Sequence, residues 1–308
     1  MIQTFTRELT NGIALHCRAA GEAGRPLMVF LHGFPEGAFI WDPLLAHFAA
    51  PEHGGFRCIA PDLRGFGGSS APAEVEAYRP HLLVQDLALL AESESAGGRV
   101  DTLVAHDWGG AFGWGFANRH ADRLDRLVII NSPHPGTFAR ELATSAEQQA
   151  ASAYMNFLAR PDAEALLAED DFRRLFGFFE AMKAGPDGFG WLTEPVRAQY
   201  RAFWRQGLTG GCNLYRVTPL KPGAPLPDAA AMPRERLTVE RPTLVLWALD
   251  DHALLPGLLD GLEDYVPRLE LEKVEGATHW IVHERPEFVA ARIEAFQRRG
   301  RKGSPSDQ

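Results

Sequence analysis

Short, mostly apolar runs alternate with segments of helical periodicity through the first 131 positions. A hairpin is expected first, because two strand-like segments flank Asn11-Gly12, a strong two-residue turn signal. The apolar runs that follow lie at residues 27–31, 56–60, 102–105 and 124–131. Helices are expected between them at residues 41–49, 81–93 and 109–119. Short apolar strands that alternate with helices predict an α/β fold whose parallel sheet carries helices on both faces.

The pattern changes after Pro133. Helices alone are expected next, at residues 146–159, 163–183, 195–206 and 211–217, and a linker rich in Pro, Ala and Gly follows at 219–233. Strands resume at residues 243–247 and 269–274, before a closing helix at 286–298. A helical block inserted into a split α/β core predicts a lid over the carboxyl ends of the strands, where open sheets bind ligands. The expected division is a core at 1–135 and 236–299, a helical lid or cap at 136–235, and a disordered tail at 300–308.

The acidic balance of the chain limits its partners. With 31 Lys and Arg against 40 Asp and Glu in 308 residues, the formal net charge is −9, so we expect no nucleic-acid partner. No run of 18 apolar residues occurs, so we expect no membrane span. The first residues show no basic region followed by an apolar stretch, so no signal peptide is expected. Three widely spaced cysteines fit reduced thiols in a cytoplasmic protein better than a disulfide framework or a zinc site.

Asp107 lies at a sharp connection between an expected strand and an expected helix. The stretch at 103–111 reads LVAHDWGGA, with small residues two positions away from the aspartate on both sides. A nucleophile elbow needs such neighbours, because its central residue is strained and projects above the sheet. The start of the helix favours an ionised carboxylate there, and a carboxylate can attack an electrophilic carbon and form an alkyl ester. The simpler alternative is that Asp107 only caps the helix.

Three motifs together resemble the epoxide hydrolases of the α/β-hydrolase fold. They are LHGFPE at 31–36, DLRGFGGSS at 62–70 and HDWGG at 106–110. The same motifs are similar, less closely, to the haloalkane and haloacetate dehalogenases that share this fold. The resemblance covers nearly the whole chain, and it implies a mostly parallel sheet with helices on both faces and an inserted helical lid.

The resemblance also implies roles for residues around Asp107. The backbone N–H groups of Phe34 and Trp108 would form an oxyanion hole, which stabilises negative charge when water adds to the ester carbonyl. The bond between Phe34 and Pro35 is expected to be cis. The alternative is a tight turn without a catalytic role. Residues expected to support the two turns are His32, Gly33, Pro35 and His106.

His279 is the expected general base. It follows the last expected strand, the usual place of the catalytic histidine in this fold, and completes the chain order nucleophile, acid, histidine. A neutral imidazole there would take a proton from the attacking water. The acid that orients it is expected in the loop that contains Asp250 and Asp251, and the resemblance favours Asp251 through its spacing to Pro256. Asn131 occupies the alternative acid position, where its amide cannot carry the charge.

Two lid tyrosines bear on the substrate class. Opening an epoxide generates an alkoxide, and a proton donor facing Asp107 would lower that barrier. The epoxide hydrolases that the chain resembles use two lid tyrosines, which Tyr154 and Tyr215 match. Tyr200 is the main competitor, and we expect it to pack within its own helix. The resemblance therefore implies that the chain opens a small-molecule epoxide to a vicinal diol, with neither a metal ion nor an organic cofactor.

Alternatives from the same residues stay open. The many aromatic residues of the lid favour an apolar substrate. A haloalkane dehalogenase would hold the departing halide with N–H donors, but Phe34 offers no side-chain donor. A haloacetate dehalogenase would bind the substrate carboxylate with an arginine after the nucleophile, but no arginine occurs within ten residues after Asp107. A hydrolase-like protein that binds without turnover is a third possibility, which the intact set of candidate residues disfavours. A homodimer formed through the lid is also possible.

Overall fold

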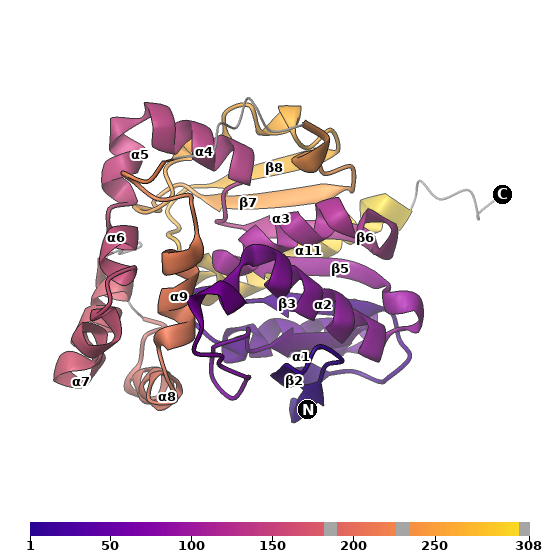
Figure 1. Ribbon diagram of the computed structural model, residues 1–308. Coiled ribbons are helices and arrows are strands. Elements are labelled where there is room, and N and C mark those ends of the chain that lie inside the picture. Colours follow the sequence, from indigo (N-terminus) through magenta and orange to yellow (C-terminus); the bar gives the residue numbers. More distant parts are fainter. Residues whose placement is uncertain (182–189, 226–233, 302–308) are drawn as a thin grey trace.

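An eight-stranded sheet forms the centre of the computed structural model, which describes residues 1–181, 190–225 and 234–301 (Figure 1). The strands are β1 (Gln3–Glu8), β2 (Ala14–Ala20), β3 (Leu27–Leu31), β4 (Arg57–Pro61), β5 (Val100–His106), β6 (Leu124–Ile130), β7 (Thr243–Ala248) and β8 (Leu269–Val274). Their order across the sheet is β1-β2-β4-β3-β5-β6-β7-β8. The pairs β1–β2 and β2–β4 are antiparallel and all later neighbours are parallel, so the expected mostly parallel α/β sheet is confirmed.

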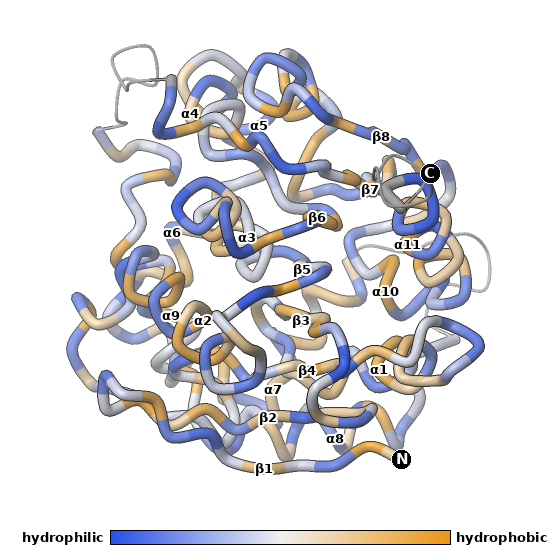
Figure 2. Tube along the Cα trace, turned by 90° about the vertical axis from the view of Figure 1, so that its right-hand side faces the viewer, coloured by the Kyte–Doolittle hydropathy of each residue, from blue (hydrophilic) through white to orange (hydrophobic). Residues whose placement is uncertain are grey.

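Helices cover both faces of this sheet (Figure 2). The helices α2 (Pro80–Glu94) and α3 (Trp108–Arg119) lie on one face, and α1 (Asp42–Ala49), α10 (Ile281–Glu284) and α11 (Pro286–Arg301) lie on the other. Successive residues of a strand point to opposite faces. In β5, Leu103 and Ala105 therefore pack in the core beneath α2 and α3, whereas Val104 packs in the core beneath α1 and α11. Burial on both faces explains why the central strands read as apolar runs.

The chain between β6 and β7 contains helices in its described residues and no strand. These are α4 (Pro135–Thr144), α5 (Ala146–Ala151), α6 (Tyr154–Leu158), α7 (Ala163–Glu180), α8 (Glu194–Trp204) and α9 (Thr209–Val217). Figure 1 shows α5 to α9 stacked beside one edge of the sheet. Side chains from α6 and α9 line the same cavities as Asp107, which follows β5, so this edge is formed by the carboxyl ends of the parallel strands.

Three features of this helical segment differ from the sequence-based expectation. Helix α4 was not expected, although Pro135 opens its first turn and the His134 side chain accepts a hydrogen bond from the Gly136 N–H, as a helix cap does. The single helix expected at 146–159 is two helices, separated by residues 152–153. Helix α7 contains non-helical backbone from Glu169 to Phe172, so it is kinked rather than continuous.

Parts of three expected segments lie outside the described residues. They are residues 182–183 of the helix expected at 163–183, residues 226–233 of the linker expected at 219–233, and the tail from residue 302 onward. Among the described helices, none combines the length and the hydropathy that crossing a bilayer requires.

Candidate active site

Asp107 forms the turn between β5 and α3, and its backbone is in a rare conformation. Its φ is 51° and its ψ is −124°, which is strained for a residue with a side chain. Neighbouring glycines make the turn possible: a Cβ on Gly109 would lie 2.5 Å from the Leu31 carbonyl oxygen, and a Cβ on Gly33 would lie 2.0 Å from Asp107 Oδ1. The Ser132 hydroxyl donates a 2.6 Å hydrogen bond to the Asp107 carbonyl oxygen. Larger residues at either glycine would displace the carboxylate.

The turn after β3 contacts the Asp107 carboxylate directly. The Phe34 N–H donates a 2.8 Å hydrogen bond to Asp107 Oδ1, and the Phe34–Pro35 bond is cis, as expected. His32 stabilises this turn, because its Nε2 accepts from the Leu63 N–H at 3.0 Å and its Nδ1 lies 2.8 Å from the Gly33 carbonyl oxygen. Burial lowers the pKa of His32, which fits a neutral ring that donates from Nδ1.

Trp108 begins α3, so its backbone N–H is one of the free donors at the first turn of the helix. The amides of Phe34 and Trp108 therefore approach Asp107 from two separate elements, β3 through its following turn and α3. The Phe34 N–H already bonds the Asp107 carboxylate, and a second donor from the Trp108 N–H would complete an oxyanion hole.

His279 lies between two carboxylates. Its Nδ1 is 2.7 Å from Asp251 Oδ2, and its Nε2 is 3.7 Å from Asp107 Oδ2. The shorter contact is a hydrogen bond that orients the ring, whereas the longer one exceeds hydrogen-bond distance and can be bridged by a water molecule. This arrangement places the second imidazole nitrogen, Nε2, next to the carboxylate of Asp107.

Neighbouring charges affect the pKa of His279 more strongly than its burial does. Burial alone would lower the pKa of this imidazole, but the charge and hydrogen bond of Asp251, together with the charge of Asp107, raise it to about 9. Burial would raise the pKa of Asp251, but the His279 charge and several hydrogen bonds lower it overall. The resting pair is therefore an imidazolium and a carboxylate at neutral pH.

Asp251 is held by more than the histidine. It is 1% exposed, and it also accepts hydrogen bonds from Asn131 Nδ2 at 2.8 Å and from the backbone N–H groups of Ala253 and Leu254. Asp250 is exposed and has no recorded contact with His279 within the described part of the chain. The geometry thus brings Asp251, rather than Asp250, to the imidazole, and Asn131 at the alternative acid position supports this carboxylate.

Tyr154 of α6 and Tyr215 of α9 face Asp107 from the helical segment. Their ring centroids are 6.1 Å apart, and Tyr215 packs edge-on against Trp108 at 5.2 Å and Phe34 at 5.5 Å. Burial raises the pKa of both phenols, and the charge of Asp107 raises each further. Both phenols therefore keep their protons at neutral pH and can donate them.

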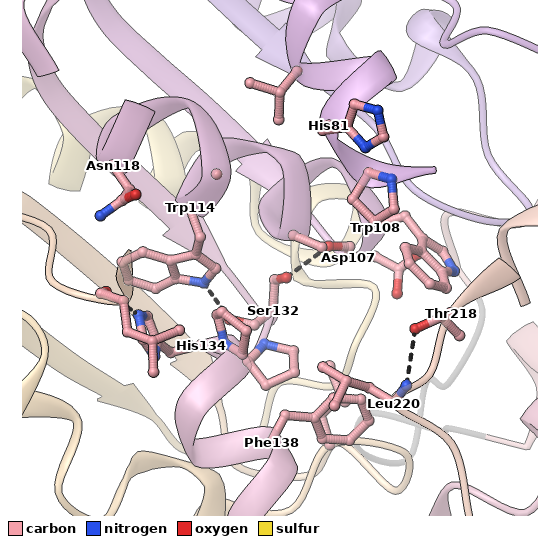
Figure 3. A pocket seen from close by; sticks show the side chains of 18 of the residues that line it. His81, Asp107, Trp108, Trp114, Asn118, Ser132, His134, Phe138, Thr218 and Leu220 are labelled. Atoms are coloured by element: carbon pink, nitrogen blue, oxygen red, sulfur yellow. Dashed lines mark hydrogen bonds between the residues drawn. The ribbon is translucent and has the colours of Figure 1, made fainter. Parts of the chain in front are cut away.

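Two cavities meet at Asp107, Tyr154 and Tyr215, the residues common to both linings. The first has a volume of about 270 Å³ and extends past Trp114 and Phe138, which Figure 3 shows along its wall. The second has a volume of about 190 Å³ and is bounded mainly by apolar side chains, including Phe34, Leu158, Phe178 and Trp280. A ligand at Asp107 can extend an apolar substituent into either cavity.

A buried carboxylate, Glu36, lies behind His279. Its Oε1 accepts from the Tyr200 hydroxyl at 2.9 Å and lies 2.7 Å from His283 Nε2, and its Oε2 is 3.2 Å from His106 Nδ1. Burial would raise the pKa of Glu36, but its contacts with His106 and His283 lower it instead. His106 in turn contacts the His279 carbonyl oxygen through Nε2 at 2.9 Å. Glu36 and His106 therefore support the position and the charge of His279.

These contacts revise two expectations. Tyr200 does not only pack within its helix, because its hydroxyl is bonded to Glu36, in the turn that follows β3. His106 contacts the loop of His279 in addition to occupying its own turn. Glu36 belongs to the LHGFPE motif, which was the available signal, but no role was assigned to it.

Gln148 of α5 is a further residue that sequence reasoning missed. Its Oε1 accepts from the Leu255 N–H at 3.0 Å, and its Nε2 donates to the Ala253 carbonyl oxygen at 2.8 Å. These bonds tie the helical segment to the loop that contains Asp251. Nothing in the sequence around Gln148 indicates this contact, because its partners lie more than a hundred residues away.

The chain resembles known proteins over almost its whole length. A family model described as the alpha/beta hydrolase fold matches residues 26–286. The mouse protein "Epoxide hydrolase 4" is 31% identical over 297 residues, which cover 95% of this chain and 78% of the relative. "Epoxide hydrolase 3" of Xenopus tropicalis is also 31% identical, over 95% of this chain and 77% of the relative.

Solved structures give the same result. An epoxide hydrolase of Bacillus megaterium in complex with an inhibitor superimposes with a TM-score of 0.83 at 30% identity, covering 95% of this chain and 99% of that chain. An epoxide hydrolase from metagenomes of hot environments gives a TM-score of 0.81 at 35% identity, covering 96% and 98% of the two chains.

Proposed function

Because the chain belongs to the epoxide hydrolases of the α/β-hydrolase family, we propose that it converts an epoxide to a vicinal diol through an ester on Asp107. One observation carries this proposal. The Asp107 carboxylate accepts the Phe34 N–H at 2.8 Å, faces His279 Nε2 at 3.7 Å, and lines both cavities together with Tyr154 and Tyr215. A nucleophile, a base and two proton donors thus surround one reaction space.

In the first half-reaction, Asp107 Oδ2 attacks one carbon of the epoxide ring. The new C–O bond forms as the ring C–O bond breaks, and the electron pair of that bond moves to the ring oxygen. Tyr154 or Tyr215 gives its proton to this oxygen, which as an alkoxide is a stronger base than the phenolate left behind. Raised pKa values keep both phenols protonated until this point.

In the second half-reaction, water adds to the ester carbonyl of Asp107. Neutral His279 takes a proton from this water through Nε2, and Asp251 stabilises the imidazolium that forms. The amides of Phe34 and Trp108 stabilise the tetrahedral oxyanion. Collapse of this intermediate releases the diol and restores the Asp107 carboxylate.

Several finer features belong to the same proposal. We propose an α/β core at residues 1–135 and 236–299 and a helical lid at 136–235, a division supported by the helices that supply Tyr154 and Tyr215. An apolar substrate is supported by the aromatic lining of both cavities. We also propose a cytoplasmic protein, where its buried thiols would stay reduced, and a possible homodimer.

Dehalogenation is the second candidate, and the residues around Asp107 disfavour it. The Trp108 indole could hold a departing halide, but its ring packs against the Tyr215 ring, with centroids 5.2 Å apart. Phe34 at the opposite side of Asp107 has no side-chain donor. Diol without halide release, measured with styrene oxide and with haloacetates, would support epoxide hydrolysis, whereas halide release alone would support a dehalogenase. If neither diol nor halide forms, the remaining candidate is a protein that binds its ligand without turnover.

Trapping the ester tests the assignment of the nucleophile. In His279→Gln the base is missing, so an epoxide is expected to alkylate the protein and the adduct to persist. Mass spectrometry of the peptide that contains Asp107 should show the added mass of one epoxide. The double variant with Asp107→Asn is the control and should carry no adduct, and an adduct on another residue would refute the assignment.

A further inference from the structure

A second cluster of ionisable side chains lies on the face of the sheet covered by α1 and α11. His47 comes from the last turn of α1, His53 from the 3-10 helix η2 (Pro51–His53), and Glu294 from α11. His47 Nε2 and His53 Nδ1 approach the same oxygen, Oε1 of Glu294, at 2.7 Å and 2.6 Å. One donor atom from each residue lies within 4.8 Å of the other two. None of the three residues lines the cavities at Asp107.

One oxygen of the Glu294 carboxylate has a further partner. Glu294 Oε2 accepts a 2.8 Å hydrogen bond from Arg298 one turn later in α11. Oε1 is therefore the oxygen that can serve as a single ligand, while Arg298 holds the other oxygen in place.

We propose that His47, His53 and Glu294 form a binding site for a divalent transition-metal ion, with Zn²⁺ the best match to the donors. Two imidazole nitrogens and one carboxylate oxygen are a common ligand set of open zinc sites. Ligand atoms about 2.0–2.2 Å from a tetrahedral ion lie roughly 3.3 Å from one another. The present separations of 2.6 and 2.7 Å must therefore open by about 0.7 Å when an ion enters.

The two imidazole rings have room for this change. They are stacked, with centroids 3.7 Å apart and planes at 22°, so at least one ring must turn to direct its lone pair at a shared ion. The side chains of His47 and His53 are 28% and 35% exposed, and His53 is followed by Gly54 in a left-handed conformation. Turning an exposed ring breaks one hydrogen bond, which the bond to the metal replaces.

An adjacent cavity supplies the fourth coordination position. It has a volume of about 260 Å³ and is lined by His53, Glu294 and Gln297, among others, which leaves space for a water ligand. An ion there would connect α11, the last of the described helices, to α1 and to η2. His47 and Glu294 are 247 positions apart in the sequence, so a motif of closely spaced ligands does not indicate this site.

Metal binding to the untagged, EDTA-treated protein tests the proposal. Co²⁺ should bind with a 1:1 stoichiometry and give the intense visible absorption of a tetrahedral site, and Zn²⁺ should displace it. Loss of a residue behind a metal ligand commonly weakens affinity about 10–100-fold. Losing a ligand itself in Glu294→Gln or His53→Gln should therefore weaken Co²⁺ binding by at least about tenfold. His120→Gln, a half-buried histidine on α3's side of the sheet, is the matched control and should bind like the unaltered protein.

Two further measurements separate this site from the active site and from a folding defect. Zn²⁺ should raise the Tm of the unaltered protein and of His120→Gln, but not that of Glu294→Gln or His53→Gln. All four proteins should hydrolyse styrene oxide equally without added metal. Absence of 1:1 binding would overturn the proposal. Binding that persists in both ligand variants while epoxide hydrolysis is inhibited would overturn it as well, because the ion would then occupy the Asp107–His279 region.

Discussion

Replacing Asp251 by Asn should separate the two half-reactions. Asp251 is buried and its Oδ2 lies 2.7 Å from His279 Nδ1, so the substitution keeps the shape and removes the charge. Asp107 does not depend on this contact for its own position, because the Phe34 N–H and the strained turn hold it. Ester formation should therefore continue in Asp251→Asn, and ester hydrolysis should fail.

The magnitude follows from the pKa of His279. Its value of about 9, compared with 6.5 for an ordinary histidine, corresponds to about 3 kcal/mol in favour of the imidazolium. Asp251 is the main source of this stabilisation, and burial, which opposes it, remains in the variant. The imidazolium that forms as water attacks should lose most of that support, which slows hydrolysis by on the order of 10²-fold. Loss of the correct tautomer adds to this, since the corresponding change in serine proteases costs about 10⁴-fold.

A rapid-quench experiment measures both ester formation and ester hydrolysis. The protein is mixed rapidly with styrene oxide and quenched with acid, and the intact protein is then examined by mass spectrometry. Asp251→Asn should accumulate the alkylated protein to near one equivalent and release diol at least about 10²-fold more slowly. Asp250→Asn is the matched control, because Asp250 is exposed and should behave like the unaltered protein. The reasoning fails if Asp251→Asn turns over at the normal rate, or if Asp250→Asn is the variant that accumulates the ester.

Three other changes test separate parts of the site. Tyr154→Phe and Tyr215→Phe should each slow ester formation by about 10²-fold, the usual contribution of one proton donor, and single-turnover quench experiments measure this. Trp204→Phe removes the indole that donates a 2.6 Å bond to the Pro35 carbonyl oxygen, so urea unfolding should show a loss of about 1–3 kcal/mol. The raised pKa of His279 contributes stability that is complete below pH 6.5 and is lost as the pH rises through about 9. Unfolding free energy should therefore fall across this window, and less so in His279→Gln.

Local features of the fold could be predicted from the sequence because local residues determine them. Strands β3 and β8 have the expected bounds. In β3, every residue is apolar and buried, so the strand stands out from its polar neighbours. The turn at Asp107 was also recognisable, because Ala105 and Gly109, two positions away on either side, are small. Helix α4 was not predicted, although Pro135 is well suited to the first turn of a helix.

Contacts between distant segments could not be predicted in the same way. The Tyr200 hydroxyl reaches Glu36 across 164 positions, and Gln148 reaches Leu255 across 107. Each is a single polar residue on a helix, where the sequence alone favours exposure or simple packing. Their partners become neighbours only when the helical segment packs on the sheet, so tertiary structure was needed to identify them.

We propose that the two carboxylates around His279 give the half-reactions their order. In the resting protein, the charges of Asp251 and Asp107 both raise the pKa of the imidazole, and at about 9 it keeps its proton and cannot act as a base. When Asp107 attacks an epoxide, its negative charge moves to the ring oxygen and the resulting ester is neutral. One of the charges that retained the imidazole proton is then gone, so the pKa of His279 falls. His279 releases one proton. Tyr154 or Tyr215 takes up one proton, which replaces the proton that it gave to the ring oxygen. His279 therefore becomes a competent base after the ester has formed, when water is the substrate of the next step.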